Sequence, residues 1–531
     1  MLNEILHYGR MTQGIGEYLR TRPHANPEEV IRRQLENRIP VFLDLVRRVV
    51  FANPQNPYFE MFRQAGCAPA DLEQSLSRNG LEKTLSMLHG NGVYLTHEEF
   101  RGNKPILRSG HSLSASPANF ENPLVTGKIL SLSSGSRGKR LRSAQNTQLR
   151  LYREAQTWLR MKELGLEGRA HLEVKPILPS MTGLGSCLWA GRLNRRVDRW
   201  FTVGGHLQDS GHYRWATHFM VLASNAMGGG VPFPTYLPPN DFSPVAEHIA
   251  RLRDRGTSCF VSAFTSPAVR IAAAAVDKGW DIGGTVFLVA GEALTDAKRA
   301  AIEKSGAQVF NSYPISEMGL MGHACSQMTA GNRVHLFKDS LAVIVHRKKA
   351  PLADLEVDSF LCTTLLPCSS YVFINAETED CGILEPAPCD CLFSRIGFTE
   401  QLRDIGSYGK LTGQGMTLVG TEVVRILEEL LPARLGGLPG DYQLVEHEGT
   451  AQTQLTLRVS PRVGLSSAEK ARECFLREIR GFFGGSLAAR TWNHAEAVKV
   501  AIAEPYATAT GKILPLYLLR VNQSEAVETA P

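Results

Sequence analysis

The sequence predicts an α/β protein, with a large domain built on parallel strands and a small α+β domain near the C-terminal end. The chain has 531 residues, of which 43% are hydrophobic and 21% charged, so it supplies the core of more than one domain. Residues 284–313 alternate strand, helix and strand at the length of a βαβ unit, which requires a parallel sheet. A Gly-rich passage at 406–415 then separates off a shorter final part.

Residues 1–115 are expected to be mostly helical and to form the N-terminal part of the large domain. Asn26 followed by Pro27 marks a helix start. The Asn side chain can cap the helix, and proline has no backbone N–H that would need an acceptor in the first turn. Apolar residues recur at helical spacing on both sides of Pro40, which is expected to separate two helices. A second helical set runs from Leu72 to Leu88. These helices are interpreted as a packing layer.

Residues 116–408 are expected to form the α/β core of the large domain. A strand at 129–132 leads into a Gly/Ser loop, and an amphipathic helix follows at 148–164. The βαβ unit consists of a buried strand at 284–290, a helix at 295–305 and a second strand at 308–313. Residues 409–531 form the small domain, with strands at 442–446 and 453–459 and a helix at 467–483.

Composition and sequence pattern exclude several classes of protein. The longest apolar stretches are far shorter than the roughly 18 residues that span a bilayer, and the N-terminus lacks the pattern of a secretory signal. A cytoplasmic protein without membrane segments is therefore expected. Its ten cysteines are then thiols or metal ligands. The net charge is +6, but the densest basic cluster is only 346–349, so no nucleic-acid partner is expected.

The loop after the first core strand, Ser131-Leu-Ser-Ser-Gly-Ser-Arg-Gly-Lys139, combines hydroxyls, two glycines and two cations. Such a loop can surround phosphate oxygens with backbone N–H groups and add charge-assisted contacts. It is not a Walker loop, because only two residues separate Gly135 from Gly138 and Lys139 is followed by Arg140. A Ser/Gly turn with exposed cations is the alternative interpretation.

Two further segments carry groups suited to nucleotide chemistry. Asn311-Ser-Tyr-Pro-Ile-Ser-Glu-Met-Gly319 lies at the C-terminal end of a predicted parallel strand, where open α/β sheets bind ligands. Tyr313 offers a ring face to a purine, and Glu317 offers oxygen atoms to magnesium. Pro505-Tyr-Ala-Thr-Ala-Thr-Gly-Lys512 places one lysine on a tight turn near the end of the chain.

Together and in this order, the three segments resemble the adenylate-forming superfamily of acyl-CoA synthetases, peptide-synthetase adenylation domains and luciferases. The resemblance covers residues 60–520 approximately and is strongest to the phenylacetate-CoA ligase branch, including its relatives in phenazine antibiotic biosynthesis. It implies a large N-terminal domain and a small mobile C-terminal domain, with ATP and magnesium bound between them. It also implies an enzyme that activates a carboxylic acid as an acyl-AMP.

The resemblance assigns a role to individual residues. The phosphate loop corresponds to Ser133, Ser134, Gly135, Ser136, Gly138 and Lys139. The strand end that lines the adenine corresponds to Gly291 and Glu292, the stacking tyrosine to Tyr313, the hydroxyl residue to Ser316, and the magnesium ligand to Glu317. Asp380 matches the aspartate that holds the ribose, and Lys512 the lysine that bridges carboxylate and α-phosphate during adenylation.

The sequence departs from the family pattern at several positions. Arg137 stands where the family usually has Thr, and Pro314 where it usually has Gly. Near the hinge, Ser407 occupies the neighbourhood of a ribose-binding arginine, for which Arg403 is the nearest candidate upstream. Lys410 is the expected pivot, and Gly409 is nearly as suitable. These departures favour one rival interpretation, a nucleotide-binding relative that has lost turnover.

Four residues form a candidate metal site: Cys325, His335, Cys389 and Cys391. Three thiolates and an imidazole are soft ligands that suit a tetrahedral structural zinc ion. The phenylacetate-ligase branch includes members with a similar set. The alternative is four buried thiol and imidazole groups without a metal.

The sequence therefore predicts an ATP- and magnesium-dependent ligase that forms an acyl-AMP and transfers the acyl group to an acceptor. Coenzyme A is the acceptor that the resemblance suggests, whereas an acyl carrier protein, another protein thiol, an amine or a hydroxyl fits as well. The substrate is expected to be an aryl or medium-sized acid bound near residues 228–234 and 264–267. A homodimer is left open.

Overall fold

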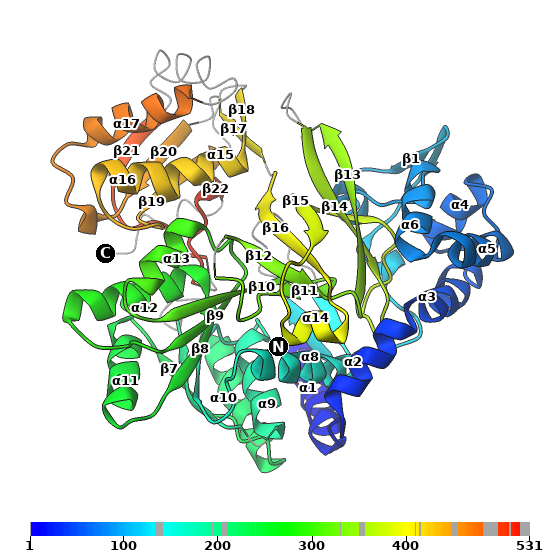
Figure 1. Ribbon diagram of the computed structural model, residues 1–531, viewed down its shortest axis with the longest axis horizontal. Coiled ribbons are helices and arrows are strands. Elements are labelled where there is room, and N and C mark those ends of the chain that lie inside the picture. Colours follow the sequence, from blue (N-terminus) through cyan, green and yellow to red (C-terminus); the bar gives the residue numbers. More distant parts are fainter. Residues whose placement is uncertain are drawn as a thin grey trace.

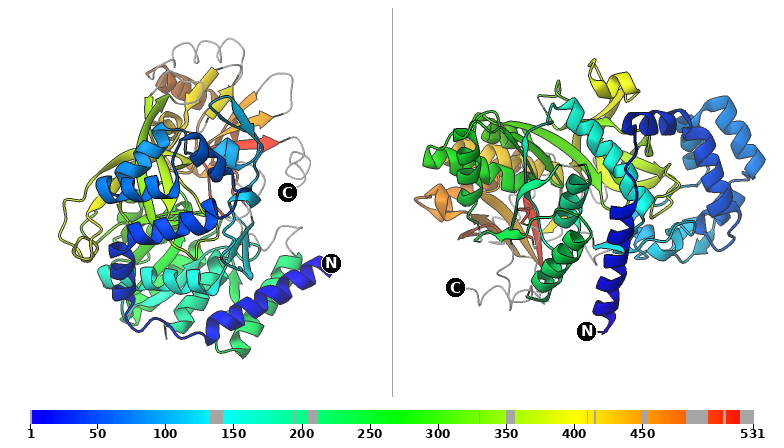
Figure 2. Two further views of the ribbon diagram at one scale, coloured as in Figure 1. Left: turned by 90° about the vertical axis from the view of Figure 1, so that its right-hand side faces the viewer. Right: turned by 90° about the horizontal axis from the view of Figure 1, so that it is seen from below.

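The computed structural model describes residues 2–132, 142–193, 195–203, 211–238, 240–329, 331–349, 356–408, 410–413, 416–448, 454–481, 498–508 and 511–520. Figure 1 shows a broad sheet covered by helices, with a smaller sheet-containing part above one end. Helices α3 to α6 and the C-terminal sheet lie at opposite ends of the long axis, as both Figure 1 and Figure 2 show.

The N-terminal region is helical, as predicted. It contains α1 (Leu2–Arg20), α2 (Pro27–Glu36), α3 (Arg38–Val46), α4 (Pro57–Gln64), α5 (Pro69–Asn79), α6 (Leu81–Gly90) and α7 (His97–Phe100). The Asn26 side chain accepts a hydrogen bond from the backbone N–H of Glu29 and so caps α2. The break between helices lies at Asn37, and Pro40 is inside the first turn of α3. A first-turn N–H has no partner within the helix, so proline is tolerated there and does not end it.

The large sheet has twelve strands among the described residues, in the order β13-β14-β15-β16-β12-β11-β10-β9-β8-β5-β6-β7. One half is parallel and consists of β5 (Ala170–Val174), β6 (Val197–Thr202), β7 (Pro234–Tyr236), β8 (Cys259–Phe264), β9 (Val286–Ala290) and β10 (Gln308–Ile315). The other half is antiparallel and consists of β11 (Gly319–His323), β12 (Arg333–Leu336), β13 (Leu341–Lys349), β14 (Glu356–Thr364), β15 (Ala376–Pro386) and β16 (Glu400–Ser407). The α/β class is confirmed, and the antiparallel half is an addition that the sequence did not predict.

Helices connect and cover the parallel half: α8 (Thr147–Glu163), α9 (Thr182–Arg192), α10 (Gly211–Ala226), α11 (Ser243–Asp254), α12 (Thr265–Lys278) and α13 (Asp296–Glu303). The predicted βαβ unit is present, because β9 and β10 are parallel neighbours joined through α13. Apolar residues of β8, β9 and α12 form one buried cluster. The last residues of β8 and β9, Phe264 and Ala290, are paired in register, so the two strands end at the same edge of the sheet. Short hairpins flank the sheet, namely β1 (Ile106–Arg108) with β2 (His111–Leu113) and β3 (Ile129–Leu132) with β4 (Arg142–Gln145), and α14 (Leu392–Ile396) precedes β16.

The C-terminal part begins with a hairpin of β17 (Lys410–Gly413) and β18 (Met416–Val419), followed by α15 (Gly420–Arg425), a π-helical turn (Ile426–Leu430) and α16 (Leu431–Leu435). Its sheet has the order β21-β20-β19-β22, formed by β19 (Tyr442–Glu448), β20 (Gln454–Val459), β21 (Val498–Ile502) and β22 (Leu516–Arg520), and α17 (Ala468–Arg480) packs against it. Leu444, Leu457 and Phe475 are fully buried in an apolar cluster of its own. This mixture of helices and strands matches the predicted α+β class.

No helix in the described part of the chain is long and apolar enough to cross a lipid bilayer.

Candidate functional site

A cavity of about 620 Å³ opens at the carboxyl ends of the parallel strands. Its walls come from β5, β8, β9 and β10 of the sheet, from helices α8 and α9, and from one residue of the C-terminal part. Four of the predicted site residues line it: Gly291, Ser316, Glu317 and Lys512. These residues are as much as 221 positions apart in the sequence, and the fold brings them to one cavity.

Lys512 is buried in this cavity, with only 9% of its surface exposed. Its Nζ lies 4.5 Å from the centroid of the Phe264 ring. Gly291 has a φ of +80°, and a Cβ atom placed there would stand 2.8 Å from the same Nζ. Glycine therefore meets two needs at this position, a left-handed backbone and room for the ammonium group. Burial lowers the pKa of Lys512, and the negative charge of Glu292 opposes that shift.

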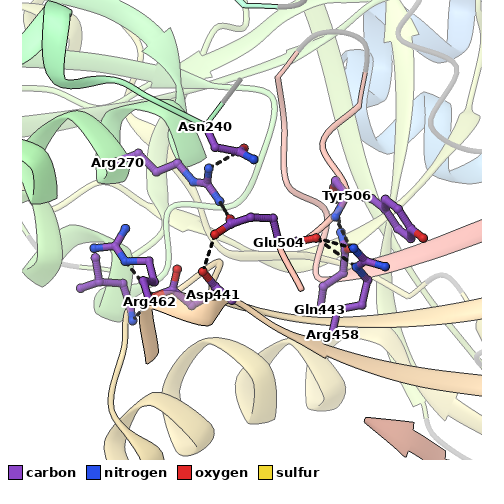
Figure 3. Close-up of polar contacts among 10 residues, drawn as sticks. Asn240, Arg270, Asp441, Gln443, Arg458, Arg462, Glu504 and Tyr506 are labelled. Atoms are coloured by element: carbon purple, nitrogen blue, oxygen red, sulfur yellow. Dashed lines mark hydrogen bonds and ion pairs between the residues drawn. The ribbon is translucent and has the colours of Figure 1, made fainter. Parts of the chain in front are cut away.

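The segment that carries Lys512 is fastened at its start, as Figure 3 shows. The Glu504 carboxylate lies 3.4 Å from the Arg270 guanidinium of α12, and Arg270 also donates to Asn240. The Arg458 guanidinium donates to the carbonyl oxygen of Glu504. Contacts of this segment thus reach both the large domain and the C-terminal sheet.

Further along, the same segment is held by Gln443 of β19. The amide of Gln443 accepts a hydrogen bond from the Tyr506 N–H and donates to the carbonyl oxygens of Tyr506 and Leu514. Arg458 lies over the Tyr506 ring at 3.8 Å from its centroid. Because these contacts flank Lys512 on both sides in the sequence, they fix where its side chain enters the cavity.

Glu292 lies next to Gly291 with its carboxylate buried. One oxygen accepts hydrogen bonds from the backbone N–H and the hydroxyl of Ser266, at 2.7 and 2.8 Å. The other oxygen is buried without a hydrogen-bond partner in the described structure. Burial raises the pKa of Glu292, whereas the positive charges of Lys298 and Lys512 lower it. A ligand that donates to the second oxygen would satisfy this carboxylate.

A buried ion pair joins the two parts of the chain near this point. Lys298 of α13 lies 2.7 Å from the Glu428 carboxylate, and both side chains are almost inaccessible to solvent. The Thr295 hydroxyl donates to the second oxygen of Glu428 at 3.0 Å. Burial by itself would lower the pKa of Lys298, but the charges of Glu428 and Glu292 hold it above its ordinary value. This pair therefore links α13, which connects two strands of the large sheet, to the C-terminal part, and losing one member would leave the other charge buried without its partner.

Tyr313 and Asp380, expected at the adenine and the ribose, are brought together by the fold. The Tyr313 hydroxyl donates to the Asp380 carboxylate at 2.6 Å, across from β10 to β15. Burial and the negative charge of Asp380 raise the pKa of Tyr313 well above its ordinary value. Ser407, at the position where the resemblance calls for arginine, donates to the carbonyl oxygen of Glu379 beside Asp380. Tyr313 and Asp380 are not among the residues that line the cavity.

Glu317 lines the cavity from the turn between β10 and β11. Burial raises its pKa, and the charges of Arg101 and His97 act in the opposite direction. A carboxylate destabilised in this way gains from a bound cation. The contribution of α7, which carries His97, was not predicted, because nothing in the sequence relates that short helix to residue 317.

Sequence analysis also missed the cationic face of α8. Arg150, Arg153 and Arg160 all line the cavity. Their separations of three and seven residues place them on one side of a helix, which is the signal that the sequence offered. The apolar residues of the same helix, which predicted it, pack into the core.

The predicted acyl-binding segments are corrected in part. Phe264 lines the cavity, but none of the residues 228–234 does. The backbone of Gly229 instead contacts α9, where a Cβ at Gly191 would lie 2.0 Å from its carbonyl oxygen. That Gly-rich segment therefore serves close packing of the backbone. The phosphate loop, Ser133, Ser134, Gly135, Ser136, Gly138 and Lys139, lies outside the described residues.

The four candidate zinc ligands meet at one point, with all donor atoms within 4.8 Å of one another. Cys389 Sγ lies 3.8 Å from Cys325 Sγ and 3.8 Å from Cys391 Sγ. Thiolates placed about 2.3 Å from a zinc ion at the corners of a tetrahedron are about 3.8 Å apart, so the spacing fits the metal. His335 Nε2 lies 3.1 Å from Cys389 Sγ and 3.3 Å from Cys391 Sγ.

The surroundings of this cluster also suit a metal. His335 Nδ1 lies 2.8 Å from the carbonyl oxygen of Phe398 and donates to it, so Nε2 presents its lone pair to the thiols. The Ser394 N–H points at Cys391 Sγ, which caps α14. The cluster is separate from the cavity, whose lining contains none of the four residues.

No protein-family model matches the sequence, and no curated protein matches it. Solved structures similar to this chain include a 2-hydroxyisobutyryl-CoA ligase in an open conformation with 2-HIB-AMP and CoA (14% identity, 91% of each chain, TM-score 0.44). They also include an anthranilate CoA ligase with anthranoyl-AMP (12% identity, 72% of this chain and 64% of that chain, TM-score 0.42). A third is the O-succinylbenzoate coenzyme A synthetase of Bacillus subtilis with ATP and magnesium (11% identity, 73% and 69%, TM-score 0.39).

Proposed function

We propose that this protein is an ATP-dependent, carboxylate-activating ligase of the adenylate-forming superfamily, related to its phenylacetate-CoA ligase branch. The observation that supports this proposal most directly is the position of Lys512. This lysine, near the end of the chain, reaches a cavity at the carboxyl ends of the parallel strands and lies beside Gly291. Ser316 and Glu317 line the same cavity. The order of these residues along the chain is the one that the resemblance implies.

The chemistry of acid activation suits these residues. A carboxylate oxygen attacks the α-phosphorus of ATP and forms the acyl-AMP bond, while the bond from that phosphorus to the bridging oxygen breaks. Pyrophosphate leaves with the electron pair. The Lys512 ammonium stabilises the negative charge that the attacking carboxylate and the α-phosphate bring together, and its buried position strengthens that effect.

Other groups hold the nucleotide in this proposal. Asp380 would accept from the ribose hydroxyls after Tyr313 turns from it toward the adenine, and the main chain at Gly291 would border the base. Glu317 would bind magnesium, which supplies positive charge to the phosphate oxygens. The raised pKa of Glu317 supports this assignment, because a cation would offset the cost of the buried carboxylate.

The acyl group then passes to an acceptor. A thiol sulfur attacks the acyl carbonyl carbon, AMP leaves, and the thiol proton is released. Coenzyme A is our first choice of acceptor, with rotation of residues 409–531 near Lys410 between the two steps. A carrier-protein thiol, an amine or a hydroxyl in natural-product biosynthesis is the second choice.

We also propose a structural zinc ion at Cys325, His335, Cys389 and Cys391. The thiol separations of 3.8 Å and the hydrogen bond that orients His335 support it. Four protein ligands leave no open position for a substrate, so the ion would tie the turn after β11 to the segment before α14.

The test is pyrophosphate release with ATP and magnesium across a panel of carboxylic acids. Wild type is compared with Lys512→Ala and with Lys499→Ala, which removes an exposed lysine of β21. Acid-dependent release that falls at least 100-fold in Lys512→Ala and is unchanged in Lys499→Ala supports adenylation, because loss of one group that stabilises transition-state charge costs on the order of 100- to 1,000-fold. ATP binding without release for any acid would favour the non-catalytic relative.

A further inference from the structure

The cavity wall formed by α8 carries more positive charge than its neighbours neutralise. Its lining includes Arg150, Arg153, Arg160, Lys175 and Lys512, but only two carboxylates, Glu154 and Glu317. Glu154 is already used, because it accepts from Arg192 at 2.6 Å and from the Tyr18 hydroxyl. Lys175 is paired with Glu173 at 2.7 Å. The remaining positive charge therefore lies on Lys512 and on the arginines of α8.

Arg150 and Arg160 differ in how many hydrogen-bond acceptors their guanidinium groups have. Arg150 donates to the Gln145 side chain and to the Gly185 carbonyl oxygen, and it lies over the Tyr18 ring. Arg160 has one hydrogen bond, from its Nη2 to the Thr157 hydroxyl at 2.6 Å. Its Nε is buried without an acceptor in the described structure. Burial lowers the pKa of Arg160 to about 10, as expected for a guanidinium that lacks a paired anion.

The carboxylate whose negative charge raises the pKa of Arg160 is that of Glu173, and this carboxylate already contacts three other groups. Glu173 is fully buried and contacts His171 at 2.9 Å, the Ser186 hydroxyl at 2.9 Å and Lys175 at 2.7 Å. It makes no ion pair with Arg160 among the described residues. Arg160 therefore lines the cavity with a positive charge that no carboxylate of the described residues pairs with.

Arg160 is also set apart from the reacting end of the cavity. Lys512 lies over Phe264, the last residue of β8. Glu173, the carboxylate whose charge reaches Arg160, is in register with Ser262, two residues earlier on β8. At about 3.3 Å per residue this is a descent of roughly 7 Å along the strands. The lining at this depth includes Trp189 and Phe260, whose rings both stack on His171. The deep end of the cavity thus combines aromatic walls with one unpaired guanidinium.

The triphosphate of ATP is the other anion that could use these arginines, and it fits Arg153 better. The Arg153 guanidinium lies 3.7 Å from the position of a Cβ on Gly319, two residues after Glu317. Arg160 follows seven residues later on the same helix, about 10 Å further along its axis. Phosphates held near Glu317 and Lys512 are therefore within reach of Arg153 and remote from Arg160.

We propose that the acid activated by this protein is a dicarboxylic acid with an apolar spacer, whose second carboxylate is bound by Arg160. One carboxylate lies at Lys512 for activation, the spacer lies against Trp189 and Phe260, and the distal carboxylate accepts from the Nη groups of Arg160. A planar guanidinium suits this task because it can donate two parallel hydrogen bonds to one carboxylate. The inference rests on the proposed adenylation and narrows its substrate class.

The experiment compares acids of matched length with and without the distal carboxylate, using pyrophosphate release as the readout. Wild type is measured beside Arg160→Met, Arg160→Lys and Lys162→Met, the last of which removes an exposed charge from the same helix. We expect kcat/KM of wild type to favour the dicarboxylic acid, and Arg160→Met to lower that value on the order of 10- to 100-fold. The monocarboxylic acid should be affected less than 3-fold, Arg160→Lys should recover part of the loss, and Lys162→Met should match wild type.

Two results would overturn the inference while leaving adenylation intact. One is a wild-type preference for the monocarboxylic acid, and the other is an equal loss for both acids in Arg160→Met. If no acid releases pyrophosphate, the proposed function fails, and thermal stabilisation by the free dicarboxylic acid is measured instead. Stabilisation of wild type but not of Arg160→Met would keep the anion site, and its absence in both would refute it. If Arg160→Met does not fold, the inference is tested by the kcat/KM values of wild type and of Arg160→Lys for the two acids.

Discussion

The Lys512 ammonium lies 2.8 Å from the point where a side chain on Gly291 would begin, so these two residues, 221 positions apart, are fitted to each other. The same Nζ stands over the Phe264 ring. An ammonium so enclosed has few water molecules around it, which lowers its pKa. The position that supports catalysis in our proposal also makes the charge of Lys512 costly to keep.

The first prediction concerns pH. The charged form of Lys512 is the active one, so activity is present below its pKa and is lost as the pH rises through it. Because burial lowers that pKa from 10.5, the alkaline limb of kcat/KM for pyrophosphate release should lie below pH 10.5. Glu292→Gln removes a charge that raises the pKa of Lys512, so the limb should move to lower pH. Glu36→Gln, an exposed position on α2, should leave it in place, and an unmoved limb in Glu292→Gln would contradict the assignment.

The second prediction is that Gly291→Ala disables activation without preventing nucleotide binding. The new Cβ would stand 2.8 Å from Lys512 Nζ and 3.0 Å from the Phe264 ring, at a φ of +80° that alanine adopts at a cost of about 1 kcal/mol. Lysine can yield by shifting its ammonium group, which moves the charge away from its position over Phe264. We expect a fall in kcat of at least 10-fold with little change in the Kd for ATP, measured by single-turnover kinetics and equilibrium binding. Gly256→Ala is the control, because its φ is also positive and nothing lies within 4 Å.

The sequence allowed the strand–helix–strand unit and the C-terminal strands to be predicted because both have clear periodicity. The strand predicted at 284–290 forms as β9 (Val286–Ala290), and the one at 308–313 forms as β10 (Gln308–Ile315). The antiparallel half was not predicted, since β15 is mostly half-buried along its length and shows no regular alternation. The helix break predicted at Pro40 was wrong, because Pro40 lies in the first turn of α3, where its missing N–H would have had no partner within the helix.

The candidate site was predictable where one residue type is required by chemistry. Lys512, Glu317 and the Cys/His set are such residues, and the fold brings Lys512 and Glu317 to one cavity and the Cys/His set to one point. The role of Arg160 was not predictable, since it depends on Glu173 being in contact with three other groups. The sequence shows which hydrogen-bond donors a helix carries, but it does not show which acceptors are already used by other groups.

The third prediction concerns the buried pair of Lys298 and Glu428. Removing one member leaves an unpaired buried charge, which costs about 3–5 kcal/mol. Glu428→Gln should therefore weaken docking of the C-terminal part and lower pyrophosphate release at least 10-fold, with α17 still folded by hydrogen exchange. Glu429→Gln is the matched control, because its pair with Arg425 at 3.5 Å is exposed and worth less than about 1 kcal/mol. Equal effects of the two substitutions would show that the pair does not hold the docked position.

The fourth prediction tests the zinc ion. Purified protein should contain one zinc per chain by elemental analysis, and Cys391→Ser should lose it, because a hydroxyl is a poor ligand where three thiolates and an imidazole are spaced for the metal. Chelation should lower the Tm of wild type and added zinc should restore it, since binding energy at a structural site contributes to folding. Cys67→Ser removes a thiol outside the cluster and should keep both the metal and the Tm. A metal-free wild type with the same Tm before and after chelation would favour four buried groups packed without an ion.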